Sequence, residues 1–211
     1  MILPFLLLYA ASTLAQEKGW KFSVSADPEL TWLSASEDVK SEGVLFGFDF
    51  TVQAENYFKE RYAYYVGISF MNFGGKIKNI TSENLQFKSG GELLPGFTAK
   101  NRLQYLTFPV GLKFRTPDYG MMAYYFQAGL LPGVRIGGNI SLPDGTNHGI
   151  SKDSNVMTCG TQLGLGCMYS TGDNTYVQGG VSFKYFFVDA MSANNIRALP
   201  IGIGLHLSFL F

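Results

Sequence analysis

The sequence predicts an all-β fold: an eight-stranded antiparallel up-and-down transmembrane β-barrel with short periplasmic turns and long extracellular loops. Three observations predict it. Apolar and polar side chains alternate along eight segments, the connections between those segments alternate between short and long, and the composition is aromatic-rich but poor in charge. Alternation with a period of two is the pattern of a strand whose two faces meet different surroundings.

The composition fits strands that have one face in lipid. The 211 residues include 18 Phe, 12 Tyr and 25 Gly, whereas charged residues make up only 15%. An average globular domain carries roughly 25% charged residues. The formal net charge of +0 offers no basic surface for nucleic acid, so nucleic-acid binding is not expected.

Residues 1–15 are expected to form a signal peptide, which leaves residues 16–211 as the barrel. The apolar run from Ile2 to Leu14 is followed by Ala15, a small residue before the expected cleavage site. The run is too short to span a bilayer as a helix, which needs about 20 apolar residues. The alternatives are a buried N-terminal helix or a membrane anchor, and no Lys or Arg precedes the apolar run.

The last segment carries the clearest alternation. Every second residue from Ile201 to Phe211 is bulky and apolar, while glycine, His206 and Ser208 occupy the positions between them up to residue 208. Similar segments begin near Trp20, Val44, Tyr62, Tyr105, Met122, Cys159 and Val177. Since a narrow lumen requires small residues, we expect the bulky face to contact lipid. The alternative is a secreted sandwich or lipocalin-like barrel with that face inward.

The connections between the segments predict the topology. The short ones are Asn56–Glu60, Thr116–Gly120 and Thr171–Asn174, and the long ones are Leu33–Gly43, Gly74–Asn101, Gly137–Val156 and Asp189–Arg197. Short periplasmic turns that alternate with long extracellular loops are typical of outer-membrane barrels. An even number of strands places both termini on one side. We therefore expect an outer-membrane protein with both termini periplasmic.

Two internal segments and the C-terminus resemble a known family. Residues 105–113 read Tyr-Leu-Thr-Phe-Pro-Val-Gly-Leu-Lys and residues 125–129 read Tyr-Phe-Gln-Ala-Gly. Both are similar to the small eight-stranded outer-membrane barrels of Bacteroidetes called the PorT-like family. Phe211, with Phe209 and Leu207 behind it, looks like the terminal signal that the barrel-assembly machinery binds during biogenesis. The resemblance implies location and fold, but no single activity.

Charged residues gather on the face expected to line the lumen: Lys21, Asp27, Glu29, Asp49, Glu55, Lys113, Arg115, Arg135 and Lys184. About eight strands enclose a lumen that side chains just fill. We therefore expect a network of ion pairs that plugs the barrel, in which Asp49 pairs with Lys113, Lys184 or Arg135. The alternative is a selective pore.

No catalytic, cofactor or metal site is expected. His206 and Ser208 have the spacing of the base and nucleophile of lipid A deacylases, but they lie near the C-terminus, at the expected periplasmic end. Cys159 and Cys167 are eight residues apart on one strand, or about 26 Å, too far for a disulfide. His148 lies in a loop with scattered carboxylates, which is a weak pattern for a metal.

The expected function is non-enzymatic, either structural or the binding of a protein partner through the extracellular loops. The second long connection is the favoured contact surface because it is apolar for a loop, with Phe87, Leu93, Leu94, Pro95 and Phe97. Outer-membrane lipid is the other expected partner. A small lipid-modifying enzyme and a narrow pore are the alternatives.

Overall fold

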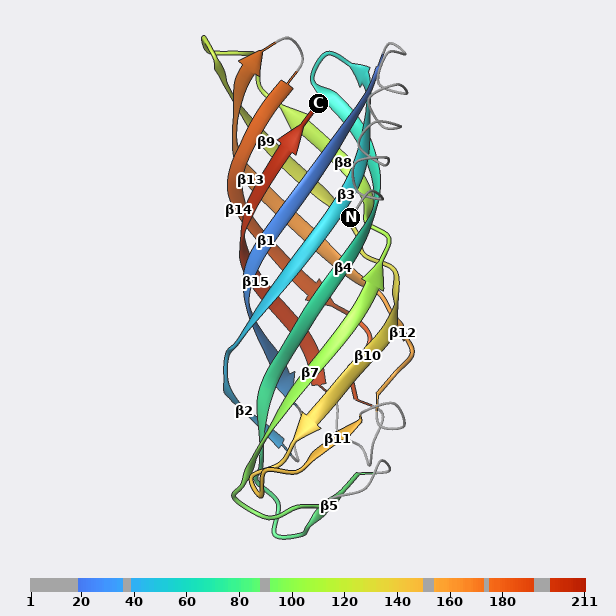
Figure 1. The fold of residues 1–211 in the computed structure, drawn as a ribbon, viewed down its shortest axis with the longest axis vertical. Coiled ribbons are helices and arrows are strands. Elements are labelled where there is room, and N and C mark those ends of the chain that lie inside the picture. Colours follow the sequence, from blue (N-terminus) through green and yellow to red (C-terminus); the bar gives the residue numbers. More distant parts are fainter. Residues whose placement is uncertain (1–18, 36–38, 88–91, 150–153, 173–174, 192–197) are drawn as a thin grey trace, which may run out of the picture.

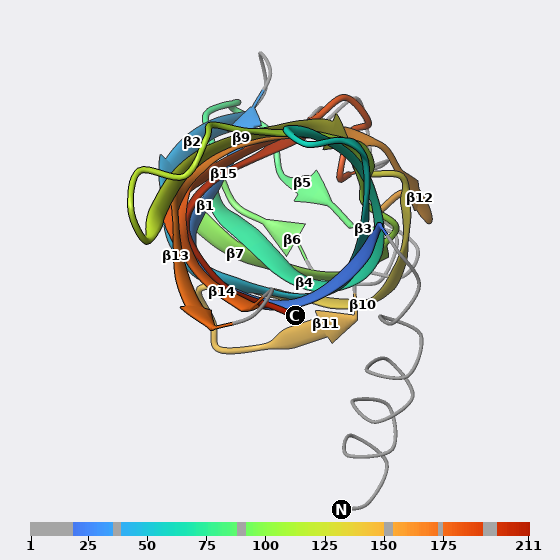
Figure 2. The ribbon, with the colours of Figure 1, turned by 90° about the horizontal axis from the view of Figure 1, so that it is seen from above.

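A computed structural model describes residues 19–35, 39–87, 92–149, 154–172, 175–191 and 198–211, and the expected signal peptide lies outside them. The described strands form a closed antiparallel ring, seen end-on in Figure 2. Around the ring lie β1 (Trp20–Ala35), β3 (Leu45–Lys59), β4 (Tyr62–Asn79), β8 (Val110–Arg115), β9 (Met122–Leu130), β13 (Gly160–Gly172), β14 (Thr175–Phe186) and β15 (Ala198–Leu210), which pairs with β1 again. The prediction of an eight-stranded antiparallel barrel is confirmed.

Two of the expected strands are each divided by a proline. β7 (Thr98–Thr107) precedes β8 and the two are separated by Phe108 and Pro109, while Leu131 and Pro132 separate β9 from β10 (Gly133–Ser141). Proline has no N–H for the hydrogen-bond ladder, so it interrupts a strand. β4 accordingly pairs with β8 along one part of its length and with β7 along the other. The prediction of continuous strands was wrong at these two points.

Some strands, β4 above all, also continue further than the sequence predicts at one end of the barrel. We call this end the loop end, and the end that holds the short turns and the C-terminus the turn end (Figure 1). β4 has 18 residues, against the 9–11 or so that cross a membrane. The expected bounds of the loop Gly74–Asn101 were therefore wrong, because β4 runs to Asn79 and β7 begins at Thr98. Short strands lie near this end: β2 (Val39–Gly43), β5 (Leu85–Gln86), β6 (Glu92–Leu93) and β11 (Asn147–Gly149). A further short strand, β12 (Met157–Thr158), pairs with the start of β10, closer to the middle of the barrel.

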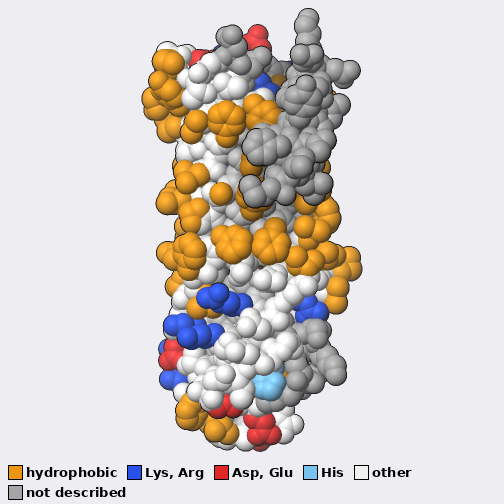
Figure 3. Space-filling model, viewed as in Figure 1, with side chains coloured by type: hydrophobic (Ala, Val, Ile, Leu, Met, Phe, Trp, Pro, Cys, Tyr) orange, Lys and Arg blue, Asp and Glu red, His pale blue; other side chains and the backbone are white. Residues whose placement is uncertain are grey.

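An apolar belt surrounds the outer wall toward the turn end (Figure 3). It consists of the bulky residues that alternate along the strands, such as Phe46, Ile68, Leu112, Leu165 and Leu205, each 56–65% exposed. Among the described residues, no helix is long and apolar enough to cross a membrane.

The interior has two layers, one polar and one apolar. The apolar layer lies at the loop end and is built around the aromatic rings of Phe73, Tyr105 and Phe186. The centroid of the Phe186 ring lies 5.4 Å from that of Phe73 and 6.4 Å from that of Tyr105. Phe87 and Leu93 from the second long connection are buried in this layer. The expectation that they form part of an exposed contact surface was therefore wrong, whereas Leu94 and Phe97 are 48% and 49% exposed.

Pairs of glycines make room for two tyrosines in the lumen. Gly166 and Gly180 face each other across β13 and β14, and the ring of Tyr125 lies directly against them. A Cβ atom at Gly180 would come within 2.4 Å of the Leu165 carbonyl oxygen and 2.7 Å of the Tyr125 hydroxyl. Tyr65 lies in the same way against Gly111 and Gly129. These glycines of the inner face thus leave the space that the two tyrosine side chains occupy.

Gly180→Ala is therefore expected to destabilise the barrel by about 1–3 kcal/mol, the usual cost of overpacking. Urea unfolding in lipid vesicles, followed by tryptophan fluorescence, measures the change. Gly179→Ala is the matched control, because a Cβ atom there meets nothing within 4 Å, and its change should stay within about 0.5 kcal/mol. Equal losses in the two variants would contradict this account of the interior.

Candidate functional site

The polar layer of the lumen is centred on Lys184, which is 1% exposed. Its ammonium group extends from β14 and forms ion pairs with Glu29 on β1 and Asp49 on β3. Asp49 also accepts hydrogen bonds from the hydroxyl groups of Thr51, at 3.0 Å, and of Ser69. The lysine therefore links three strands of the wall through buried, charge-assisted hydrogen bonds.

Two glycines of the intervening strand leave room for this contact. β15 lies between β14 and β1, and it presents Gly202 and Gly204 to the lumen. A Cβ atom at Gly204 would come within 2.7 Å of Glu29 Cγ, and one at Gly202 within 3.4 Å of Glu29 Oε2. The glycine face of the last strand is thus what allows the ion pair to form across it.

A second buried ion pair joins Lys113 on β8 to Glu55 on β3, with 2.6 Å between Nζ and Oε1. Lys113 also donates to the side-chain oxygen of Gln178 at 3.0 Å, and its ammonium lies 5.0 Å from the centre of the Tyr125 ring. Glu55 accepts further hydrogen bonds from Gln53 and Tyr57, each at 3.1 Å. The pair with Glu55 reaches past β4, and the contact with Gln178 on β14 crosses the lumen.

His206 belongs to the same polar layer. Its Nδ1 atom lies 3.0 Å from both carboxylate oxygens of Asp27, and the ring packs edge-on against Tyr125 at 6.1 Å. His206 and Ser208 are 8% and 7% exposed and face the lumen from β15. The histidine is therefore oriented by a carboxylate, but it lies inside the wall and away from the lipid-facing surface.

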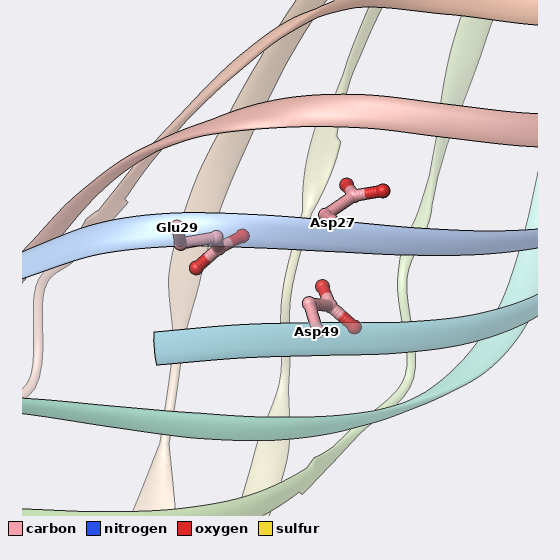
Figure 4. A group of neighbouring side chains, drawn as sticks. All are labelled: Asp27, Glu29 and Asp49. Carbon is pink, nitrogen blue, oxygen red and sulfur yellow. The ribbon is translucent and has the colours of Figure 1, made fainter. Parts of the chain in front are cut away.

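Three carboxylates come close enough to one another to suggest a metal site: Asp27, Glu29 and Asp49, whose nearest oxygens lie within 4.8 Å (Figure 4). Asp27 and Glu29 come from β1 and Asp49 from β3. Lys184 contacts two of these carboxylates and His206 contacts the third. Because protein groups already supply a positive partner or a histidine to each carboxylate, we assign the cluster to the ion-pair network and not to a metal.

Described residues enclose a small cavity beside this network. A cavity of about 10 Å³ is lined by polar residues that include Asp27, Gln127 and His206, which is room for roughly one water molecule. Gln162 donates to the Tyr65 hydroxyl at 2.9 Å and so fills more of the cross-section. Toward the loop end, the apolar layer follows.

The residues expected in the charge network have separate locations. Asp49 forms an ion pair with Lys184, and Lys113 forms one with Glu55. Arg135 instead donates hydrogen bonds to the carbonyl and hydroxyl oxygens of Ser154. Arg135 thus contacts a different part of the protein from the two lysines. Arg115 pairs with Asp118 at 2.6 Å, and Cys159 and Cys167 are free.

The partners in the network were only partly anticipated. The alternation of side chains along each strand indicates which residues face inward. It does not indicate which of them meet across the lumen, so the contacts of Gln178, Gln162 and Tyr65 could not be predicted from the sequence. Glu29 and Glu55 were expected in the lumen, without an assigned partner.

The closed ring, the apolar belt and the polar interior together define a transmembrane β-barrel of the outer membrane. The chain belongs to the family described as outer membrane protein beta-barrel domain, whose model matches residues 14–189.

Solved structures share this fold at low sequence identity. Neisserial surface protein A is 12% identical, with 92% of this chain and 96% of that chain covered and a TM-score of 0.53. OprG from Pseudomonas aeruginosa is 11% identical, with the same coverage of 92% and 96% and a TM-score of 0.50. Likeness at such identity extends to the fold alone. Among curated proteins, no relative matches the sequence.

Proposed function

We propose that this outer-membrane barrel is non-enzymatic, that both of its termini are periplasmic, and that its loop end is a rigid surface for binding a protein partner. The observation that carries the proposal is the filled interior. Buried ion pairs occupy the lumen between Lys113 and Lys184, and an apolar core follows toward the loop end. Along the part of the lumen that the described residues line, this filling obstructs the passage of a solute and leaves the outer surfaces available for function.

The loop end has the features of a binding surface. A hollow of about 270 Å³ is lined by Leu94, Phe97, Leu142 and Pro143, with Glu92 and Asp144 beside them. Hydrogen bonds from Thr146 hold the pKa of Asp144 below its usual value, so this carboxylate is ionised at neutral pH. An apolar hollow with acidic residues at its edge suits an apolar side chain of a partner that also carries positive charge.

The alternative of a lipid-modifying enzyme has less support. Such an enzyme needs its nucleophile and base within reach of a lipid headgroup. His206 faces Asp27 inside the lumen, and Ser208 lies two residues further along the same inner face. Both residues fit better in a structural hydrogen-bond network.

We also infer that the chain is a PorT-like barrel, on the strength of the segment from Tyr105 to Lys113. Within it, Pro109 marks the break between β7 and β8, and Lys113 makes the buried pair with Glu55. The residues that carry the resemblance thus have structural roles in the barrel.

Recordings across planar bilayers test the filled lumen. The wild-type protein should give no steady current above the leak of the bilayer, and a large, stable conductance would contradict the proposal. A second measurement addresses catalysis: lipid A from cells that make the wild-type protein and from cells that make His206→Ala should give the same mass spectrum. If the wild-type protein changed the mass of lipid A and the His206→Ala variant did not, the protein would be an enzyme.

A further inference from the structure

The outer wall changes abruptly from apolar to polar next to the belt, on strands β4 and β7. On β4, the outward residues Ile68 and Phe70 are followed by Asn72 and then by lysines. On β7, Leu106 lies opposite Phe70, and Gln104 lies opposite Asn72. The two strands therefore leave the hydrocarbon at the same height, and the polar residues beyond occupy the level of lipid headgroups.

Cations cluster just beyond this boundary. The cluster, which we call the basic patch, consists of Lys40, Lys76, Lys78, Lys100 and Arg102 on the outer faces of β2, β4 and β7. Lys76 pairs in register with Lys100, and Lys78 with Lys40. Like charges directly opposite each other across strands are destabilising, so an anion bound here would stabilise the arrangement.

The described part of the chain supplies one carboxylate to the basic patch. Glu42 accepts from Lys78 at 3.1 Å and from the Thr98 hydroxyl, and these hydrogen bonds hold the pKa of Glu42 below its usual value. Of the five cations, only Lys78 has an ion-pair partner among the described residues. Among the described residues, this part of the outer wall therefore carries more positive than negative charge.

A polar hollow adjoins the basic patch. It has a volume of about 390 Å³ and is lined by Asn72, Arg102, Gln104, Gly138 and Asn139, which is within the range of small-ligand clefts. A bulge between Arg135 and Gly137 shifts the register of β10 here, and a Cβ atom at Gly137 would come within 2.6 Å of Gln104 Oε1. Amide side chains can both donate to and accept from sugar hydroxyls, and a guanidinium group suits a phosphate.

The turn end has no comparable excess of charge among its described residues. Lys59 and Arg61 flank Glu60 in the turn between β3 and β4, and Arg115 pairs with Asp118. The basic patch is thus specific to one side of the membrane. The difference corresponds to the two leaflets of an outer membrane, of which the outer one carries phosphorylated glycolipid.

We propose that the basic patch and the adjoining hollow bind the phosphorylated headgroup of an outer-leaflet glycolipid. Arg102, Lys100 and Lys76 bind phosphate, the amides of the hollow contact sugar hydroxyls, and the acyl chains lie along Phe70 and Leu106. The continuity of the hollow with the apolar belt favours a ligand that joins a polyanionic head to lipid chains over a soluble polyanion. The proposal rests on the proposed orientation, with the loop end outside the cell.

Native mass spectrometry of the purified full-length protein tests this binding. The probes are lipid A with two phosphates, the same lipid A without phosphates, phosphatidylglycerol and a soluble sulfated polysaccharide. The wild-type protein should retain the bisphosphorylated lipid A most strongly. The triple variant Lys76→Gln, Lys100→Gln, Arg102→Gln should bind it about 100-fold more weakly, at about 1 kcal/mol for each cation.

The matched control is the double variant Lys59→Gln, Arg61→Gln, which removes exposed cations from the turn end and should bind like the wild type. Equal retention of lipid A with and without phosphates would overturn the proposal, as would equal retention of phosphatidylglycerol or a preference for the soluble polysaccharide. An equal loss of binding in the triple variant and the control would do the same.

The orientation is tested separately. In a variant with both native cysteines replaced by Ser, the added substitution Leu94→Cys should give a protein that reacts with a membrane-impermeant maleimide on intact cells. Since the binding measurement uses purified protein, a failure of the orientation and a failure of glycolipid binding are distinguishable.

Discussion

Lys184→Met is expected to lower the free energy of unfolding by about 3–5 kcal/mol, because it leaves two buried carboxylates without their positive partner. Glu29 and Asp49 are 2% and 3% exposed, so water cannot replace the ammonium group. The expected result is a clear fall in the midpoint of urea unfolding in lipid vesicles. Heat-modifiable gel mobility shows whether the variant still forms a closed barrel.

Two further variants test whether the loss of stability comes from the uncompensated buried charges. Combining Lys184→Met with Glu29→Gln and Asp49→Asn removes the whole triad and should recover most of the lost stability. Lys78→Met breaks an exposed ion pair with Glu42 and should change stability by no more than about 1 kcal/mol. If the combined variant were less stable than Lys184→Met alone, the loss would arise from packing and not from uncompensated charge.

Leu93→Ala is expected to destabilise the loop end by about 2–5 kcal/mol, the usual cost of a cavity in a packed core. Leu93 is fully buried in the apolar layer and pairs with Leu85 across the short strands β5 and β6. Since this layer holds the second long connection against the barrel, limited proteolysis should cleave that connection faster in the variant. Urea unfolding measures the accompanying change in overall stability.

The neighbouring residue provides the control. Leu94 is 48% exposed, so Leu94→Ala should change stability and proteolysis little, within about 0.5 kcal/mol. Equal sensitivity of the two leucine variants to protease would show that the second connection is not held by the core. The proposed binding surface would then have no rigid base.

The alternation along the strands was enough to predict the barrel and its two faces. Asp49 and Lys184 were both assigned to the lumen from their positions among alternating residues, and the structure pairs them. The same rule could not predict that Lys113 selects Glu55, because the two residues lie on strands separated by β4. Strand register and side-chain reach determine such contacts, and neither is encoded locally.

Depth in the membrane was the other quantity that the sequence pattern did not resolve. Phe70 and Lys76 have the same parity on β4 and face the same way, yet one lies in the belt and the other in the basic patch. Three of the four long connections were consequently expected to begin too early, because β1, β4 and β10 run on to Ala35, Asn79 and Ser141. The change from aromatic to basic residues on the outward positions was the signal that could have located the boundary.

The contact between the first and last strands determines when the barrel can close. Phe22 and Phe211 exchange backbone hydrogen bonds of 2.8 Å, and the pairing of β1 with β15 runs from Ser23–Leu210 to Ala35–Ala198. This seam has the highest contact order in the ring, so its closure carries the largest loop entropy. Until the last strand is in place, the sheet has two open edges that can pair with another chain. The predicted assembly signal, Leu207, Phe209 and Phe211, lies on this seam.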